Sequence, residues 1–223
     1  MPMAGKGMLL TSMDIDATDE AEFNRWYDRE HLGERVAIDG FLEARRYIAH
    51  DGRPKYLSLY STATFDVLDS PAYRAALANQ TEWSKANIAR FKNMIRSLAR
   101  ITVSRGTGRG AALGIIRLRP PDGGDEKLRA ALREQLDPAK LDGIISMHLI
   151  ESDATLSKPI TDAPSAPNPG AADWFVLIDA TDVNALPAAT ARINDNAAFK
   201  SLVISSGAYT LMWDLVNSDL PRG

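Results

Sequence analysis

Three histidines are the residues of this chain best suited to acid–base chemistry near neutral pH: His31, His50 and His148. Histidine titrates close to neutrality and can accept or donate a proton at a bound molecule. His31 lies four residues after Tyr27 and four before Arg35, so the three side chains share one face if the segment is helical. The spacing predicts a proton-transfer site at His31; the structural alternative is a histidine that packs near a helix end.

Other polar side chains could bind a ligand from the predicted strands. The planar fork of Arg45 suits a carboxylate or enolate oxygen, and it suits an interfacial ion pair equally well. Tyrosine hydroxyls could donate hydrogen bonds to a carbonyl, or the rings could serve only as aromatic packing. His148 aligns with Arg45 when Asp142-Gly143 is matched to Asp39-Gly40, which predicts an interior position. The candidate catalytic residue is His31, and the candidate substrate-binding residues are Tyr27, Arg35, Arg45, Tyr47, Tyr56, Tyr60 and His148.

Composition excludes several kinds of chemistry. The 223 residues include no cysteine, which removes disulfides, thiolate nucleophiles and cysteine-ligated metals. No two histidines have the spacing of a metal-binding pair, so neither a metal site nor a cofactor is predicted. A net charge of −3 argues against general nucleic-acid binding. No apolar run reaches the roughly 18 to 20 residues of a membrane span, and the start is no signal peptide, so we expect a cytoplasmic protein.

The pattern of apolar residues and turns predicts strand, helix, strand, strand, helix, strand, in that order and then again. Each half therefore predicts a ferredoxin-like unit, residues 1–106 and 107–223, joined at a glycine-rich junction. A single α+β domain is the alternative. The predicted strands are 7–16, 41–49, 55–64, 96–104, 111–119, 144–151, 173–181 and 208–216; the predicted helices are 19–36, 66–78, 82–94, 124–136 and 183–200. The proline-containing stretch 153–172 is predicted to be a long mobile loop.

Two such units must cover the open face of each sheet, so we expect them to pair sheet to sheet as an intrachain α/β barrel. In the third strand, Leu57 and Leu59 alternate with Tyr56 and Tyr60. The apolar set is expected to face the helices and the tyrosine set the barrel interior. A polar, aromatic interior predicts a small-molecule cavity there; the alternative is an interface that side chains fill completely.

The run from Phe23 through Trp26-Tyr27-Asp28-Arg29-Glu30-His31 to Gly40-Phe41-Leu42 and Arg45-Arg46-Tyr47 resembles EthD-like members of the dimeric α/β-barrel superfamily. The likeness covers about 30 residues, all in the first half. It implies ferredoxin-like units paired sheet to sheet and a histidine near the opening of the barrel. The second half lacks the Glu-His pair, so the resemblance does not extend to it.

The superfamily contains several kinds of activity, and the fold does not choose among them. We expect a small-molecule ligand and a cofactor-free enzyme of monooxygenase, isomerase or dehydratase type, acting on an aromatic or carbonyl compound with His31 as acid or base. The alternatives are a non-catalytic ligand-binding or stress-related protein and a haem-binding or haem-degrading enzyme. A homodimer stays open.

Overall fold

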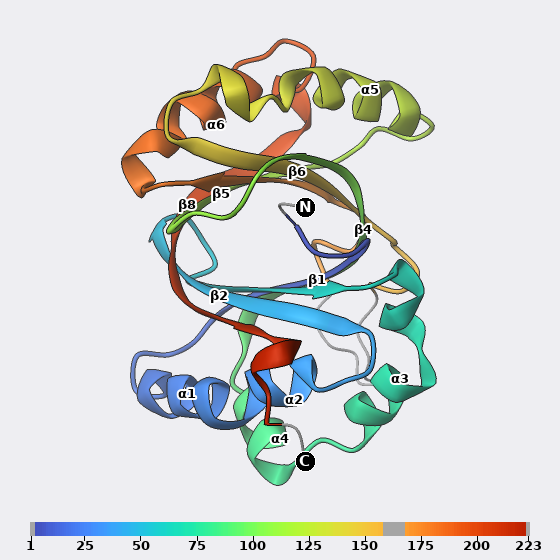
Figure 1. The fold of residues 1–223 in the computed structure, drawn as a ribbon, viewed down its shortest axis with the longest axis vertical. Coiled ribbons are helices and arrows are strands. Elements are labelled where there is room, and N and C mark those ends of the chain that lie inside the picture. Colours follow the sequence, from blue (N-terminus) through green and yellow to red (C-terminus); the bar gives the residue numbers. More distant parts are fainter. Residues whose placement is uncertain (1–2, 158–167, 222–223) are drawn as a thin grey trace.

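A computed structural model describes residues 3–157 and 168–221 of the chain, so part of the predicted loop 153–172 lies outside the described residues. Eight strands form one closed antiparallel barrel, with helices on two opposite outer sides (Figure 1). The α+β class predicted from the sequence is confirmed. Within the described ranges, no helix is long and apolar enough to cross a bilayer.

The element order repeats the same pattern in the two halves of the chain. The strands are β1 (Gly7–Asp14), β2 (Phe41–Asp51), β3 (Tyr56–Thr62), β4 (Lys92–Gly106), β5 (Ala112–Leu118), β6 (Ile144–Ser152), β7 (Trp174–Ala180) and β8 (Val203–Val216). The helices are α1 (Glu20–Trp26), α2 (Leu32–Val36), α3 (Pro71–Ala78), α4 (Glu82–Ile88), α5 (Asp125–Gln135) and α6 (Leu186–Asn194). The last strand of each half starts a few residues earlier than predicted, because β4 and β8 are long enough to serve both halves.

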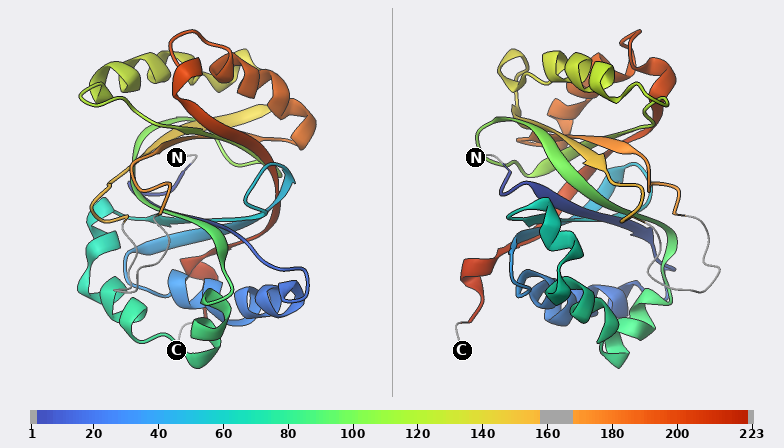
Figure 2. Two further views of the ribbon diagram at one scale, coloured as in Figure 1. Left: turned by 180° about the vertical axis from the view of Figure 1, so that it is seen from behind. Right: turned by 90° about the vertical axis from the view of Figure 1, so that its right-hand side faces the viewer.

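Around the barrel the strands follow the order β1-β3-β2-β8-β5-β7-β6-β4. Each half thus contributes four neighbouring strands, ordered fourth, first, third, second. The long strands β4 and β8 close the barrel, because β4 also pairs with β6 and β8 with β2. Helices α1 to α4 cover the outside of the first four strands, and α5 and α6 cover the others (Figure 2).

Two turns occupy equivalent places in the halves. Asp39-Gly40 precedes β2 and Asp142-Gly143 precedes β6. Both glycines have positive φ, +86° and +73°, a conformation that glycine adopts without steric cost. A Cβ at Gly40 would lie 2.5 Å from Val67, and one at Gly143 would lie 2.7 Å from Ala185. Each turn therefore needs glycine both for its backbone conformation and for the close approach of the following helical segment.

The barrel interior is filled by side chains from both halves. An apolar cluster there contains Leu57, Leu59, Phe175 and Leu177, all almost fully buried. Tyr56 and Tyr60 belong instead to the cluster beneath α1 and α2. The predicted orientation of β3 was therefore wrong: its leucines face the interior and its tyrosines face the helices. All seven β3 residues are buried, so contrast between buried and exposed positions could not reveal which face is which.

A buried polar network crosses the interior and joins the two halves. Arg45 of β2 contacts Asp179 of β7 with an Nη1–Oδ1 distance of 3.1 Å, and both side chains are almost completely buried. His148 Nε2 lies 3.5 Å from Asp179 Oδ2 and 3.0 Å from Ser146 Oγ, while its Nδ1 lies 3.0 Å from Ser104 Oγ. Burial alone would raise the pKa of Asp179, but the hydrogen bond from His148 and the charge of Arg45 hold that pKa below its usual range.

We expect the Asp179→Asn substitution to lower the free energy of unfolding by about 3 to 5 kcal/mol, because it leaves the Arg45 charge buried and uncompensated. Urea unfolding measures this. The pair's contribution should be present above about pH 4 and disappear as the pH falls further, since the carboxylate is more acidic in the folded state. Asp66→Asn removes an exposed carboxylate and should change stability little. A loss below about 1 kcal/mol for Asp179→Asn would contradict the assigned role.

Candidate functional site

The helix that carries His31 contains a wide π-helical turn. Helix α1 passes without a break into a π turn over Tyr27–His31 and then into α2. The backbone N–H of Leu32 donates to the carbonyl of Tyr27, five residues earlier. Such π turns inside α-helices are frequent at functional sites because they change the direction of neighbouring side chains. Here the turn begins and ends with two of the predicted site residues.

A cavity of about 100 Å³ lies between this helix and the sheet, on the outer side of the barrel. Helices α3 and α4 also contribute to its wall. The cavity brings together four of the predicted site residues from three separate segments of sequence: Tyr27, His31, Arg35 and Tyr60. The remaining lining is mostly apolar or neutral: Leu9, Thr11, Met13, Tyr73, Leu77, Gln80, Ile88, Phe91, Met94 and Arg96. No carboxylate lines this cavity in the part of the chain that the structure describes.

His31 is held in a hydrophobic, aromatic environment. Its ring centroid lies 4.2 Å from that of Trp26 and 5.0 Å from that of Tyr27, and only 8% of the residue is exposed. Burial and, to a smaller degree, the charges of Arg35 and Arg46 hold the pKa of His31 well below its ordinary value. The imidazole is therefore neutral at pH 7. Its Nδ1 is buried and has no hydrogen-bond partner among the described residues, which leaves it available to a molecule in the cavity.

Arg35 and Tyr60 supply donors to the same cavity. Arg35 is 4% exposed and forms no ion pair with any described carboxylate, an unusual situation for a buried guanidinium. The Tyr60 hydroxyl is buried and lacks a partner within the described ranges, as does that of Thr11. Burial raises the pKa of Tyr60 well above its ordinary value, so the hydroxyl stays protonated and can donate. The cavity therefore combines a neutral base with donors that suit a developing negative charge.

Arg46 is a contributor that the list of candidate residues did not include. Its side chain is fully buried and its guanidinium carbon lies 4.2 Å from the centre of the Tyr27 ring. Asp28 accepts a hydrogen bond from Arg46 at 3.0 Å, and Asn24 accepts another. Arg46 thereby fixes the helix on β2 and adds positive charge near His31. The resemblance had already drawn attention to the sequence Arg45-Arg46-Tyr47, but only the fold separates the two arginines by face.

Glu30, the partner of His31 in the Glu-His pair, points away from the cavity and has a positioning role. One Oε1 atom accepts hydrogen bonds from Trp26 Nε1 at 3.1 Å, Thr81 Oγ1 at 2.7 Å and Ser84 Oγ at 3.0 Å. Thr81 is also the N-cap of α4 and accepts a hydrogen bond from the Ser84 backbone. Glu30 consequently ties α4 to the helix that carries His31 and fixes the indole against which the imidazole packs.

The remaining candidate residues lie elsewhere, so the structure divides the predicted set in two. Arg45, Tyr47 and His148 are inside the barrel, on the opposite face of the sheet from His31. Tyr56 lies beneath the helices, with its ring centre 5.4 Å from the Arg46 guanidinium carbon, but it does not line the cavity. The expectation of a single cavity between the two sheets, shared by His31 and Arg45, was therefore wrong.

The geometry at the histidines does not fit a haem. The His31 cavity is far smaller than the roughly 300 to 1,000 Å³ typical of sites for drug-sized ligands. Both ring nitrogens of His148 already lie 3.0 Å from serine hydroxyls in a fully buried network. The residues described here also contain no group of three or more metal-ligating side chains. At about 30 Å³ per water, the cavity has room for three waters or for the reactive end of a compact organic molecule.

Comparison with solved structures identifies the architecture. The chain is similar to an anthrone oxidase-like protein, at 11% identity and a TM-score of 0.63 over 95% of this chain and 93% of that one. It is similar to a proposed monooxygenase from Lactobacillus acidophilus NCFM (12%, 0.56, 96% and 94%). It is also similar to a haem-binding protein from Thermus thermophilus (10%, 0.53, 95% and 92%). These likenesses show the fold, that of the dimeric α/β-barrel proteins. No family model and no curated protein matches the sequence.

The neutral state of His31 predicts a pH-dependent stability. Between its lowered folded pKa and the value near 6.5 expected in the unfolded chain, the unfolded state binds more protons. The free energy of unfolding should therefore fall as the pH is lowered below about 6.5, with a slope of up to about 1.4 kcal/mol per pH unit. Urea unfolding at several pH values tests this. The slope should be reduced in His31→Gln and kept in the exposed control His50→Gln; equal slopes in all three proteins would contradict a buried neutral imidazole.

Proposed function

We propose that the chain binds a compact carbonyl or phenolic compound in the His31 cavity and that His31 removes a proton from it. The observation that carries the proposal is the pairing of a neutral imidazole, whose Nδ1 has no partner among the described residues, with a buried Arg35 that has no carboxylate partner there. A base needs its lone pair free, and a nascent oxyanion needs a positive charge or a hydrogen-bond donor. Both requirements meet in one cavity.

In the proposed step, His31 accepts a proton from a phenolic O–H or from a C–H next to a carbonyl. The electron pair left behind moves onto oxygen, where Arg35 and the protonated Tyr60 stabilise the phenolate or enolate. Returning the proton to a different atom completes an isomerisation, and loss of a β-hydroxyl from the enolate completes a dehydration. Oxygenation would need molecular oxygen as a second substrate. Two of the similar structures are described as an anthrone oxidase-like protein and a proposed monooxygenase, which agrees with this class of chemistry.

The same proposal includes the organisation of the chain. We infer that residues 1–106 and 107–223 are two tandem ferredoxin-like units, of which only the first, EthD-like one has a His31 site. The repeated element order, the matching strand order and the equivalent Gly40 and Gly143 turns support this division. In the second half, the outer cluster beneath α5 and α6 is apolar throughout and includes Leu132, Ile178 and Phe199.

Proton exchange provides a test that does not require the final product to be known. A panel of compact phenols, ketones and 1,3-dicarbonyl compounds is first screened by thermal shift, and the binders are incubated with the protein in D2O. We expect protein-dependent deuterium incorporation at the acidic carbon of at least one binder, measured by proton NMR. The His31→Gln variant should lose about 100-fold or more of this rate, while Tyr60→Phe should retain binding with a slower rate.

The control is His50→Gln, which alters an exposed histidine outside this cavity and should exchange like the wild type. Binding without exchange in any protein would identify a ligand-binding protein without turnover. Full exchange in His31→Gln would remove His31 from the role of base. Failure of every compound to bind would contradict a small-molecule site for this class of ligand.

A further inference from the structure

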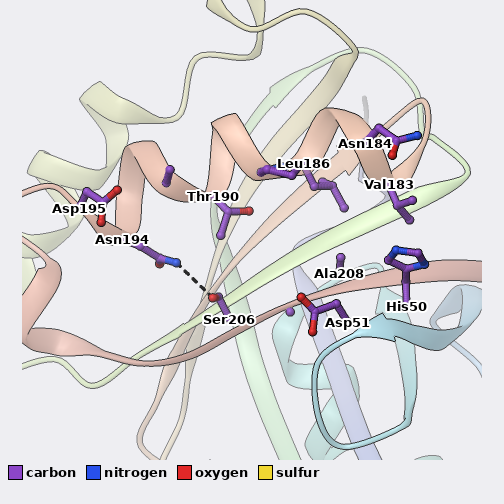
Figure 3. Close-up of a pocket in the computed structure, with 13 residues that line it drawn as sticks. His50, Asp51, Val183, Asn184, Leu186, Thr190, Asn194, Asp195, Ser206 and Ala208 are labelled. Atoms are coloured by element: carbon purple, nitrogen blue, oxygen red, sulfur yellow. Dashed lines mark hydrogen bonds between the residues drawn. The ribbon is translucent and has the colours of Figure 1, made fainter.

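A second cavity, unrelated to the His31 site, lies where the two halves of the chain meet. It is a groove of about 510 Å³ between α6, β8 and the end of β2 (Figure 3). This volume is within the range of roughly 300 to 1,000 Å³ found for small-molecule sites. His50 and Asp51 come from the first half, and all other lining residues come from the second. Neither half alone would form it.

The charges in the groove are exclusively negative. Asp51 and Asp195 line it, and neither forms an ion pair with any residue that the structure describes, whereas most buried or half-buried carboxylates elsewhere do. No lysine or arginine belongs to the described lining. Figure 3 shows Asp195 at one end of α6 and Asp51, beside His50, toward the other end. The groove therefore presents two uncompensated carboxylates that are separated along its length.

A buried acceptor without a partner lies at the Asp195 end. Asn194 donates from Nδ2 to Ser206 Oγ at 3.1 Å, as Figure 3 shows, but its Oδ1 is buried and has no hydrogen-bond partner among the described residues. An unsatisfied acceptor of this kind calls for an N–H or O–H donor from a ligand or from water. Asn194 and Asp195 also end helix α6, where the helix dipole favours a cation. Three independent features thus favour a positively charged donor at this end.

The wall between the two ends is apolar. Val183, Pro187 and Ala191 recur at intervals of four residues along one side of this helical segment, and Leu186 lies beside them. Methylene groups could be buried against this surface without leaving a polar group unpaired. No aromatic ring lines the groove in the described part of the chain, so the stacking platform that sugars and nucleobases use is missing.

We propose that the groove binds a linear aliphatic diamine or polyamine, with one ammonium group at Asp195 and Asn194 and another at Asp51. The methylene chain would lie along the apolar side of α6. The site is independent of the proposed chemistry at His31, because the two cavities share no lining residue. Occupation would link the two halves of the chain, since Asp51 and Asp195 belong to different halves.

Isothermal titration calorimetry of the full chain with spermidine and with 1,4-diaminobutane tests the proposal at low ionic strength. We expect saturable binding of one molecule per chain, and at least tenfold weaker binding of n-butylamine, which has only one ammonium group. Asp195→Asn and Asp51→Asn should each weaken spermidine binding by about tenfold, because each removes one charge-assisted contact. Both residues are exposed, so the variants should fold normally.

Asp66→Asn is the matched control, because it removes the same charge from an exposed position outside the groove. It should bind spermidine like the wild type. Equal weakening by Asp66→Asn would show attraction to net charge rather than a site and would overturn the proposal. So would the absence of saturable binding, or equal affinity for n-butylamine and the diamines. His31→Gln should leave spermidine binding unchanged, which separates this proposal from the function assigned to the other cavity.

Discussion

Each four-stranded sheet of this protein has helices on one face only, and mutual burial of the two open faces is the constraint on which the other features depend. The interior contains apolar side chains from both halves, among them Leu57, Phe175 and Leu177. The long strands β4 and β8 make the burial continuous, since each pairs with a strand of the other half. Closure into a barrel also leaves no sheet edge unpaired, which removes the tendency of edge strands to associate.

Filling the interior determines where chemistry can occur. A tightly packed centre, crossed by the buried Arg45–Asp179 contact, leaves little room for a ligand between the sheets. The helix-covered outer face of the first sheet is less completely filled, and the cavity beneath the π turn lies there. The same fold therefore uses one face of β2 to join the two halves through Arg45 and the opposite face to support the His31 site through Arg46.

The two halves have diverged in how they use equivalent layers. Beneath α1 and α2, aromatic and charged groups such as Trp26, His31 and Arg46 surround the cavity. Beneath α5 and α6 the packing is aliphatic, with Leu128, Leu132 and Ile193 as typical members. Retaining polar groups in the first layer carries an energetic cost, since a buried guanidinium without a carboxylate partner is unfavourable. That cost is reasonable for a site that binds a polar ligand and has no evident purpose for stability alone.

The sequence by itself determined the order of the elements, the α+β class and the common face of Tyr27, His31 and Arg35. These properties depend on local periodicity: helical spacing places residues four apart on one face, and strand alternation separates Arg45 from Arg46. Tertiary structure alone decided which face of each strand points inward. Both faces of β3 are buried, so alternation groups Tyr56 with Tyr60 and Leu57 with Leu59 without saying which pair meets the helices.

Long-range pairing decided the rest. Asp179 has no distinguishing local pattern, and only the closed barrel brings it to Arg45 across 134 positions of sequence. The groove between Asp51 and Asp195 likewise exists only because β8 crosses from its own half to β2. Periodicity records the neighbours of a residue along its own element, whereas these contacts depend on which distant element packs against it, and that is set by the burial of complete surfaces.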